Sequence, residues 1–297
     1  ISACLVGSEM CIRDSASGMI TLYSGTQPMG QGIATSYLQI FSEQLQIPVK
    51  QLKVEQGDTD MVEGHGSVGS RSLFVGGNAI LRGIEDFLEE CKQLAASELE
   101  ASIEDLEYHQ GNFQVKGTRV GIGIFDLCSR QSGNSISVKR KKELTGRSWP
   151  NGCHVAEVEI DAETGEVRLD RYVSVDDVGN TVNPMIVHGQ VQGGIASGLG
   201  QAVLERTEYD ASGQLLSGSY MDYALPRADD MPSLSGSLFE KVPCLTNPLG
   251  AKGTGEIGAV AGPPAIVHAV IDALAEKGIT QVDMPLQPQK IWECLNR

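Results

Sequence analysis

A single carboxylate stands inside a glycine-rich stretch near the C-terminal end of the chain. The stretch is Asn247–Pro264, NPLGAKGTGEIGAVAGPP, and its carboxylate is Glu256. Glycine has no Cβ, so Gly253, Gly255 and Gly258 can adopt φ > 0 and turn backbone N–H groups toward an anion or a large cofactor. The stretch is too rich in glycine for ordinary core, and we predict a binding loop that carries one acidic group.

Three further glycine-rich segments precede this one, at residues 28–32, 64–72 and 189–200. Each carries one or two polar side chains, and one such segment alone would not be specific. Four in one chain, counting residues 250–258, favour a large, polar, anionic cofactor held from several sides by backbone N–H groups.

Two of these segments come close to nucleotide-binding motifs and then depart from them. Gly253–Gly258 has the GxGxxG spacing, but two prolines stand before it where a buried strand is needed. Gly64–Arg71 has the spacing of a phosphate loop, but Ser70 and Arg71 replace Lys and Ser or Thr. A nucleotide-dependent oxidoreductase is therefore kept as an alternative function.

The other reactive residue types show no site-forming pattern. The five histidines are scattered without i, i+4 spacing, the seven cysteines include no CxxC pair, and no serine lies in a GxSxG elbow. These observations oppose a zinc or iron–sulfur site, a disulfide framework and a hydrolase triad on this chain. We expect no metal held by side chains of this chain, and a reducing, cytoplasmic setting.

The composition describes an acidic globular chain of 297 residues, 41% of them hydrophobic. Its net charge of −15, from 38 acidic and 23 basic residues, opposes a nucleic-acid partner, because such proteins carry a basic surface. Its most apolar window, Ile257–Ala275, is interrupted by two prolines, His268 and Asp272. We therefore expect no membrane-spanning segment.

The elements of the first half place the first two glycine-rich segments before helices. A strand after Gly18, the turn GTQPMGQG, a helix that Pro48 ends and the strand VKQLKVEQGD form a β-turn-α-β unit, which suits an anion. The second segment leads into a helix of roughly residues 75–98. Three shorter elements should follow, a helix SIEDLEYH from Ser102, a hairpin around Gly111 and Asn112, and a helix GIFDLCSRQSG.

The second half is expected to contain two hairpins and two helices. Cys153–Ser174 alternates as a long antiparallel hairpin, and Glu208–Tyr220 predicts another around DASG. Between them IVHGQVQGGIASGLGQAVLE predicts a helix of small residues that can pack close to another backbone. The helix AIVHAVIDALAEKG should begin behind Pro263 and Pro264 and end at Gly278, before a proline turn and a short C-terminal helix.

We divide the chain into four parts. Residues 1–15, ISACLVGSEMCIRDS, resemble a translated adapter sequence and are taken as a probable non-native leader, with a disordered terminus as the alternative. Residues 16–134 form a first lobe, residues 135–150 a linker, and residues 151–297 a second lobe with the glycine-rich stretch. In the linker, KRKK at Lys139–Lys142 favours a solvated connection over a targeting or polyanion-binding patch.

Five motifs resemble, in order and spacing, the molybdenum-binding subunit of the xanthine dehydrogenase, aldehyde oxidase and carbon monoxide dehydrogenase family. They are PMGQG (28–32), GSVGSRS (66–72), DVGNTVNPMIVHGQVQGGIASGLGQ (177–201), DYALPRADDMP (222–232) and NPLGAKGTGEIG (247–258). The resemblance covers nearly everything from Ala16 onward but only the second half of that subunit. It implies an α+β, two-lobed second molybdenum-binding domain, with mixed sheets and hairpins packed by helices and the cofactor at the junction.

The resemblance also implies a role for individual residues. Glu256 corresponds to the catalytic general base. Metal contact would be made only through the pterin dithiolene. The residues that correspond to cofactor contacts are Met29, Gly30, Gln31, Gly69, Ser70, Arg71, Ser72, Gln190, Lys252, Gly253, Thr254 and Gly255.

The activity implied is water-dependent hydroxylation of a heterocycle or an aldehyde by a molybdenum–molybdopterin cofactor, expected in its cytosine dinucleotide form. The partners implied are the upstream molybdenum-binding half, without which the fragment should be inactive, an iron–sulfur subunit with [2Fe-2S] and a subunit with FAD. A non-catalytic scaffold or degenerate homologue is the remaining alternative, and the presence of both Gln31 and Glu256 counts against it.

Overall fold

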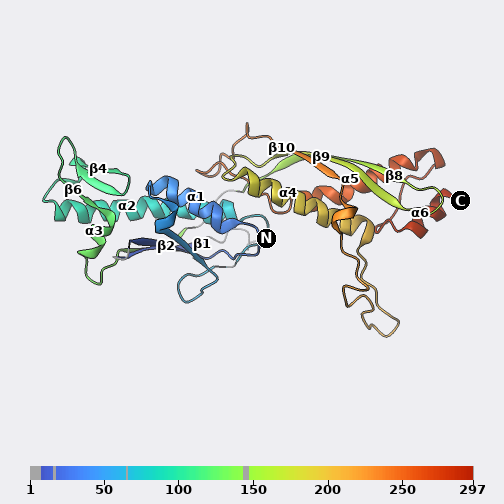
Figure 1. Cartoon of the computed structure of the whole chain (residues 1–297), viewed down its shortest axis with the longest axis horizontal. Coiled ribbons are helices and arrows are strands. Elements are labelled where there is room, and N and C mark those ends of the chain that lie inside the picture. Colours follow the sequence, from blue (N-terminus) through green and yellow to red (C-terminus); the bar gives the residue numbers. More distant parts are fainter. Residues whose placement is uncertain (1–7, 16–17, 65, 143–146, 297) are drawn as a thin grey trace. The chain divides into compact units, whose positions relative to one another are not determined.

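The computed structural model describes residues 8–15, 18–64, 66–142 and 147–296 (Figure 1). They form two compact units. The first contains the described residues up to Trp149 and the segment Pro243–Gly253, and the second contains Pro150–Val242 and the residues from Thr254 onward. The predicted α+β class is confirmed. The segment Pro243–Gly253 differs from expectation, since it packs in the first unit and not with the second lobe.

The main sheet of the first unit has the strand order β3-β2-β1-β7. Strands β2 (Met19–Ser24) and β3 (Leu52–Gln56) are parallel, and α1 (Ile33–Leu45) makes the crossover that a parallel pair requires. Alternate residues of β2 are buried, as strand geometry demands. The predicted β-turn-α-β unit is confirmed.

Two parts of the chain that we expected outside the lobes are strands of this sheet. Strand β1 (Ser8–Ser15) pairs antiparallel with β2 and with β7 (Ser137–Lys142). The predicted linker is therefore wrong over Ser137–Lys142, because Val138 is buried and the backbone completes the ladder of β1. Exclusion of residues 8–15 from the fold is also wrong, since Met10 and Ile12 are buried. The non-native origin of residues 1–15 stays a prediction, and residues 1–7 lie outside the described residues.

A long helix and a small sheet complete the first unit. The predicted helix near residues 75–98 is α2 (Asn78–Glu98), entered through a π-helical turn at Ser72–Gly77. The helix predicted from Ser102 is wrong beyond one 3₁₀ turn, because β4 (Leu106–His109) forms there. It pairs with β5 (Asn112–Val115) in the expected hairpin, followed by β6 (Gly121–Gly123) and the expected short helix α3 (Ile124–Ser129). Leu106 and Phe113 are buried on the inner face of this hairpin, which favours strand over helix.

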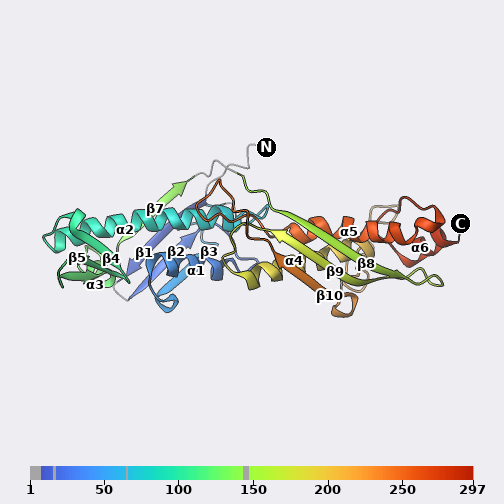
Figure 2. The same cartoon turned by 90° about the horizontal axis from the view of Figure 1, so that it is seen from above.

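The second unit is a three-stranded sheet covered by helices (Figure 2). Strands β8 (Asn151–Ile160) and β9 (Val167–Asp177) form the predicted long hairpin, and β10 (Ser233–Leu238) adds a parallel edge that we did not predict. Helices α4 (Pro184–Leu199), α5 (Ile257–Ala273) and α6 (Pro288–Leu295) supply the rest of the core. Its buried members include Tyr172, Val191, Ile195, Ile266, Val270 and Ile291.

The hairpin predicted at Glu208–Tyr220 is reduced to its turn. Asp210 accepts hydrogen bonds from the backbone N–H groups of Ser212 and Gln214, and the flanking segments share one isolated bridge, between Tyr209 and Leu215. Tyr209 is 62% exposed and Leu215 37%, so no second layer supports a longer ladder. Within the part of the chain that the structure describes, no helix is both long and apolar enough to cross a membrane.

Candidate functional site

Two of the predicted glycine-rich segments lie side by side in the first unit. Gly25 and Gly64 touch backbone to backbone, and a Cβ on either would collide with the other segment. The N–H of Gly66 donates to the carbonyl of Gly25 (3.3 Å), and the hydroxyl of Ser67 donates to the carbonyl of Gln27 (2.6 Å). The turn before α1 and the loop before α2 therefore form one continuous surface.

Gln31 holds this surface in place. Its Oε1 accepts from the N–H of Met29 (2.8 Å), and its Nε2 donates to the carbonyl of Gln27 (2.8 Å) and to Oγ of Ser67 (3.3 Å). Gly30 has φ 90°, a conformation that glycine adopts without strain. Met29 is 60% exposed at the tip. Of the predicted cofactor contacts, Met29, Gly30 and Gln31 are thus brought beside Ser67, which we had not singled out.

The loop Gly66–Ser72 has the backbone of an anion-binding turn. Gly66, Gly69 and Ser70 have φ of 77°, 57° and 55°, and Arg71 returns to the right-handed region. Such reversals turn successive N–H groups to one side. Ser72 then opens the π-helical turn that continues into α2, so the loop also stands at the positive end of a long helix.

The glycine-rich segment 250–258 contacts this loop. A Cβ on Gly253 would collide with the backbone carbonyl of Ser70, so only glycine permits the contact. The N–H of Gly253 also donates to Oγ of Ser148 (3.3 Å), and the neighbouring Lys252 is 6% exposed. Gly69, Ser70, Arg71, Ser72, Lys252 and Gly253 are therefore gathered in the first unit with Met29, Gly30 and Gln31.

A pair of buried asparagines anchors the chain at Asn247–Ala251, where the segment 250–258 begins. Nδ2 of Asn78, at the start of α2, donates to Oδ1 of Asn247 (3.2 Å), and Oδ1 of Asn78 accepts from the N–H of Leu249 (3.2 Å). Nδ2 of Asn247 donates to the carbonyl of Ala251 (3.1 Å). Sequence reasoning gave Asn78 no role. A single asparagine in the first turns of a predicted helix carries no signal that its partner lies 169 residues away.

The side chain of Tyr37 stabilises the end of the loop Gly66–Ser72 by hydrogen bonding. Its hydroxyl donates to the carbonyl of Ser72 (2.7 Å) and bonds to Oγ1 of Thr26 (3.1 Å), and Gln56 reaches the same Oγ1 (2.7 Å). Tyr37 is fully buried, and burial raises its pKa, so the phenol keeps its proton. Gly76 has no Cβ and so leaves room for the hydroxyl oxygen of Tyr37. This network was also missed, since its members are unremarkable in sequence.

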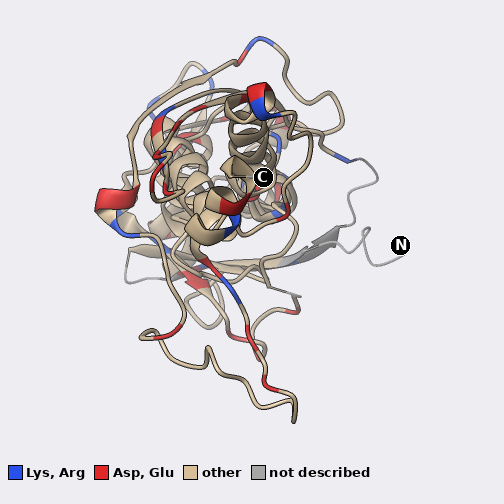
Figure 3. Cartoon of the chain, turned by 90° about the vertical axis from the view of Figure 1, so that its right-hand side faces the viewer, with Lys and Arg blue, Asp and Glu red and all other residues tan. Residues whose placement is uncertain are grey.

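The remaining predicted residues lie in the second unit. Glu256 is exposed and directly precedes α5, with its carbonyl accepting the N–H of Val260 (2.9 Å), while Thr254 accepts from Ile257 (3.2 Å). Gly255 lies between them, and the half-buried Gln190 is on α4. Helix α4 contains no Lys, Arg, Asp or Glu and α5 only Asp272, so both are almost free of charge (Figure 3). Glu256 is the carboxylate that directly precedes the first residue of α5.

The glycines of the stretch Asn247–Pro264, which spans the end of the first unit and the start of α5, do not act as we predicted. None of Gly253, Gly255 and Gly258 has positive φ, and Gly250 (φ 66°) has it instead. The segment 189–200 lies in the small-residue helix that we predicted and ends in a π turn, so it is not a loop that turns N–H groups toward a ligand. Helix α5 begins at Ile257 and not behind the two prolines, because Gly258 and Gly262 let it lie directly on α4 and this contact holds the turns that the prolines weaken.

We predicted that the small-residue helix packs close to another backbone, and the structure shows that this backbone is α5. A Cβ on Gly194 would lie 2.9 Å from the Cα of Gly258, and one on Gly262 would lie 3.2 Å from the Cα of Gly198. Backbone contact at these points fixes where α5 begins, and hence where Glu256 stands. Among the residues that the structure describes, no group of three His, Cys, Asp or Glu side chains could hold a metal ion.

Comparison with known proteins decides what this arrangement belongs to. Residues 5–232 match the model of the molybdopterin cofactor-binding domain. The chain belongs to this family. The resemblance to the molybdenum-binding subunit of the xanthine dehydrogenase and carbon monoxide dehydrogenase family is thereby confirmed.

Three relatives illustrate the similarity. The chain is 32% identical to the gamma subunit of the 6-hydroxypseudooxynicotine dehydrogenase complex of Paenarthrobacter nicotinovorans, over 95% of this chain and 36% of the relative. It is 33% identical to the carbon monoxide dehydrogenase large chain of Hydrogenophaga pseudoflava, over 96% and 36%. The structure of quinoline 2-oxidoreductase from Pseudomonas putida 86 matches with a TM-score of 0.86 at 31% identity, over 98% and 38%. The chain spans little more than a third of each.

Proposed function

We propose that this chain is the part of a molybdenum hydroxylase subunit that holds the pterin cofactor and supplies the general base. The observation that carries the proposal is the meeting of three glycine-rich segments in the first unit of a molybdopterin-binding family member. The reaction is water-dependent hydroxylation of a heterocycle or an aldehyde. A non-catalytic scaffold is less consistent with Gln31 and Glu256 both being present.

The residues present fit a phosphate-bearing pterin. Gly25–Gly32 and Gly66–Ser72 contain no acidic side chain, one arginine, and the hydroxyl and amide donors of Ser67, Ser70, Ser72 and Gln31. A Cβ on Gly64 or Gly253 would collide with the backbone of the neighbouring loop, so these glycines let the loops come together. Backbone N–H groups, hydroxyls and a guanidinium are the groups that bind phosphates. We assign Met29–Gln31, Gly69–Ser72 and Lys252–Gly253 to this cofactor, with Gln190, Thr254 and Gly255 contributing from the second unit.

In this proposal the chain's own residues orient and move a proton. The bound molybdenum cofactor supplies the two-electron redox chemistry of the hydroxylation. Glu256 accepts a proton at its carboxylate from the attacking, water-derived oxygen, and the rigid start of α5 keeps that carboxylate in one place. An exposed base on a fixed helix end can reach a reactant and return its proton to solvent.

The remaining proposals concern the assembly. We infer a cytosine dinucleotide form of the cofactor, and transfer of electrons to partner subunits with [2Fe-2S] and FAD. The names of two relatives, a complex subunit gamma and a large chain, support the existence of further subunits but do not identify them. Turnover would require the upstream half of the subunit, and the six described cysteines, all free thiols, suit the cytoplasm.

The proposal is tested by Glu256→Gln in the assembled complex. The amide keeps the shape of the side chain and cannot take a proton. We expect the rate to fall by about 10² to 10⁴ with the molybdenum content unchanged. Glu276→Gln, at an exposed carboxylate beyond α5, is the matched control and should turn over normally. Normal turnover of Glu256→Gln would refute the assignment of the base.

A further inference from the structure

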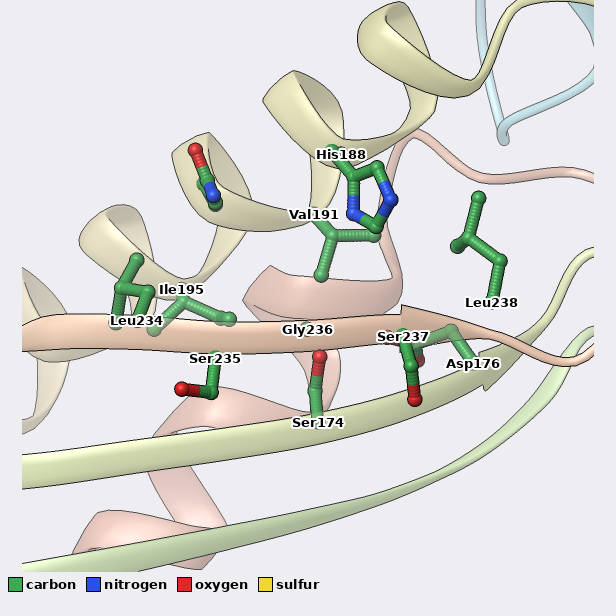
Figure 4. Close-up of a pocket in the computed structure, with 11 residues that line it drawn as sticks. Ser174, Asp176, His188, Val191, Ile195, Leu234, Ser235, Gly236, Ser237 and Leu238 are labelled. Carbon is green, nitrogen blue, oxygen red and sulfur yellow. The ribbon is translucent and has the colours of Figure 1, made fainter.

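A small recess lies in the second unit between the sheet and α4 (Figure 4). Strand β9 contributes Ser174 and Asp176 to it, β10 contributes Gly236, and α4 contributes His188 with Val191 and Ile195. The first four surround its polar part, and the last two close its apolar side. None of the residues predicted to bind the cofactor lines it.

Asp176 carries an oxygen without a partner in this recess. Its side chain is fully buried, and Oδ1 lies 2.9 Å from Nε2 of His154, which is 3% exposed. Oδ2 has no hydrogen-bond partner among the residues that the structure describes. A buried carboxylate oxygen left without a donor keeps the cost of its desolvation, so such an atom is normally satisfied by a bound group.

The side chains behind Asp176 cannot supply the missing donor. Burial raises the pKa of Tyr172, with the charge of Asp176 as the second cause, so its hydroxyl stays protonated and donates to Nδ1 of His154 (2.9 Å). Nε2–H of His154 then donates to Oδ1 of Asp176. A Cβ on Gly152 would stand 2.5 Å from the same Oδ1, so backbone closes that side. Both N–H and O–H donors of this chain of groups are used, and Asp176 with its unpartnered Oδ2 lines the recess.

The size and lining of the recess set what can enter it. The space open to a water-sized group is about 10 Å³, which is close to the room that one water needs. A Cβ on Gly236 would lie 3.4 Å from Oγ of Ser174 and 3.7 Å from Nδ1 of His188, so the missing side chain of Gly236 leaves these two polar atoms facing a shared space. With Oδ2 of Asp176 they make three partners, within the two to four that a buried water has.

We propose that this recess is a binding site for one water-sized polar ligand, held by Oδ2 of Asp176, Oγ of Ser174 and the ring of His188. Its chemistry is that of a hydrogen-bond donor or a monovalent cation, hence water, ammonium or an alkali ion. The ligand ties β9 to the turn of α4 that carries His188, two residues before Gln190. It therefore fixes the helix from which Gln190 projects.

The test is a crystal structure of the protein at a resolution that orders water molecules. We expect a density peak in the recess at about 2.7–3.2 Å from Oδ2 of Asp176. Crystals grown with rubidium as the sole monovalent cation identify the source, since an anomalous peak marks a cation site and its absence beside a normal peak marks water. An empty recess, or Oδ2 bonded directly to another side chain, would overturn the proposal.

Gly236→Ala tests the same site by filling it. The new methyl stands at ordinary contact distance from Ser174 and His188, and Gly236 does not have positive φ, so the variant should fold. We expect the peak to disappear in this variant. Gly193→Ala, on α4 where a Cβ meets nothing within 4 Å, is the control and should keep it. A peak that survives Gly236→Ala unchanged would contradict the site as drawn.

Discussion

At the scale of single residues, the candidate site depends on glycines that permit contact and on buried polar groups that hold the contact in register. Gly253 touches the carbonyl of Ser70, and Asn78 fixes Leu249 and Asn247. Gly253 and Ser70 are proposed cofactor contacts, whereas Asn78, Asn247 and Leu249 act only by positioning them. They position the loop on which Lys252 stands, and substitutions here should separate binding of the cofactor from folding.

Gly253→Ala should impair cofactor binding more than folding. The methyl would collide with the backbone of Ser70, which cannot move as a flexible side chain can, so the two loops must separate. We expect a loss of about 1–3 kcal/mol in the free energy of unfolding, as for an overpacked site, and a marked fall in pterin content. Urea unfolding and pterin fluorescence after acid release measure the two. Full pterin content in a folded variant would contradict the contact.

Tyr37→Phe tests the hydrogen bonds that stabilise the end of the loop Gly66–Ser72. Removing the hydroxyl leaves the carbonyl of Ser72 and Oγ1 of Thr26 without a buried partner. The expected loss is about 1–3 kcal/mol in the free energy of unfolding, measured by urea denaturation. Tyr23→Phe is the control, since Tyr23 is only half-buried on β2, whereas Tyr37 is fully buried. Equal free energies of unfolding of the two variants would show that the hydrogen bonds of the Tyr37 hydroxyl do not stabilise the fold.

At the scale of elements, the position of Glu256 follows from the packing of α4 on α5. Gly258→Ala would place a methyl against the backbone of Val191 and Ile195. We expect about 1–3 kcal/mol of lost stability, together with slower turnover of the assembled complex because the start of α5 moves. Gly193→Ala, in open space on the same helix pair, should be neutral or gain up to about 1 kcal/mol. Thermal unfolding distinguishes them, and a neutral Gly258→Ala would contradict the backbone contact.

The elements that sequence could predict are those whose signal is local. The hairpin β8–β9 alternates along most of its length, and the glycines of α4 recur at helical spacing, so both elements were predicted. Strands β7 and β10 were missed because their pairing partners are distant in the chain, and KRKK at Lys139–Lys142 carries a charge pattern that favours solvent. Helix α5 was started too late because Pro263 and Pro264 break a helix unless packing supports it.

The same limit applies to the candidate site. Gln31, Arg71 and Glu256 could be singled out because each stands in a short motif with its own pattern. Asn78 and Tyr37 could not, since their roles arise only when chain segments far apart come into contact. All four glycine-rich segments were expected to turn N–H groups toward a cofactor, yet the glycines of α4 and the start of α5 serve contact between helices.

At the scale of the whole molecule, the chain spans 36% of the length of its curated relatives, so substrate choice cannot be assigned to it. Binding of the molybdenum cofactor is the property that can be tested with this chain. Its net charge of −15 also favours a neutral or cationic partner surface over a nucleic acid.

The most direct measurement is the molybdenum and released cytidine nucleotide content of the native complex recovered with this chain as bait. Inductively coupled plasma mass spectrometry gives the metal, and chromatography after acid hydrolysis gives the nucleotide. We predict about one molybdenum and one cytidine nucleotide per chain, the stoichiometry of a single cofactor site. A complete complex that contains neither molybdenum nor cytidine nucleotide would contradict the proposed function.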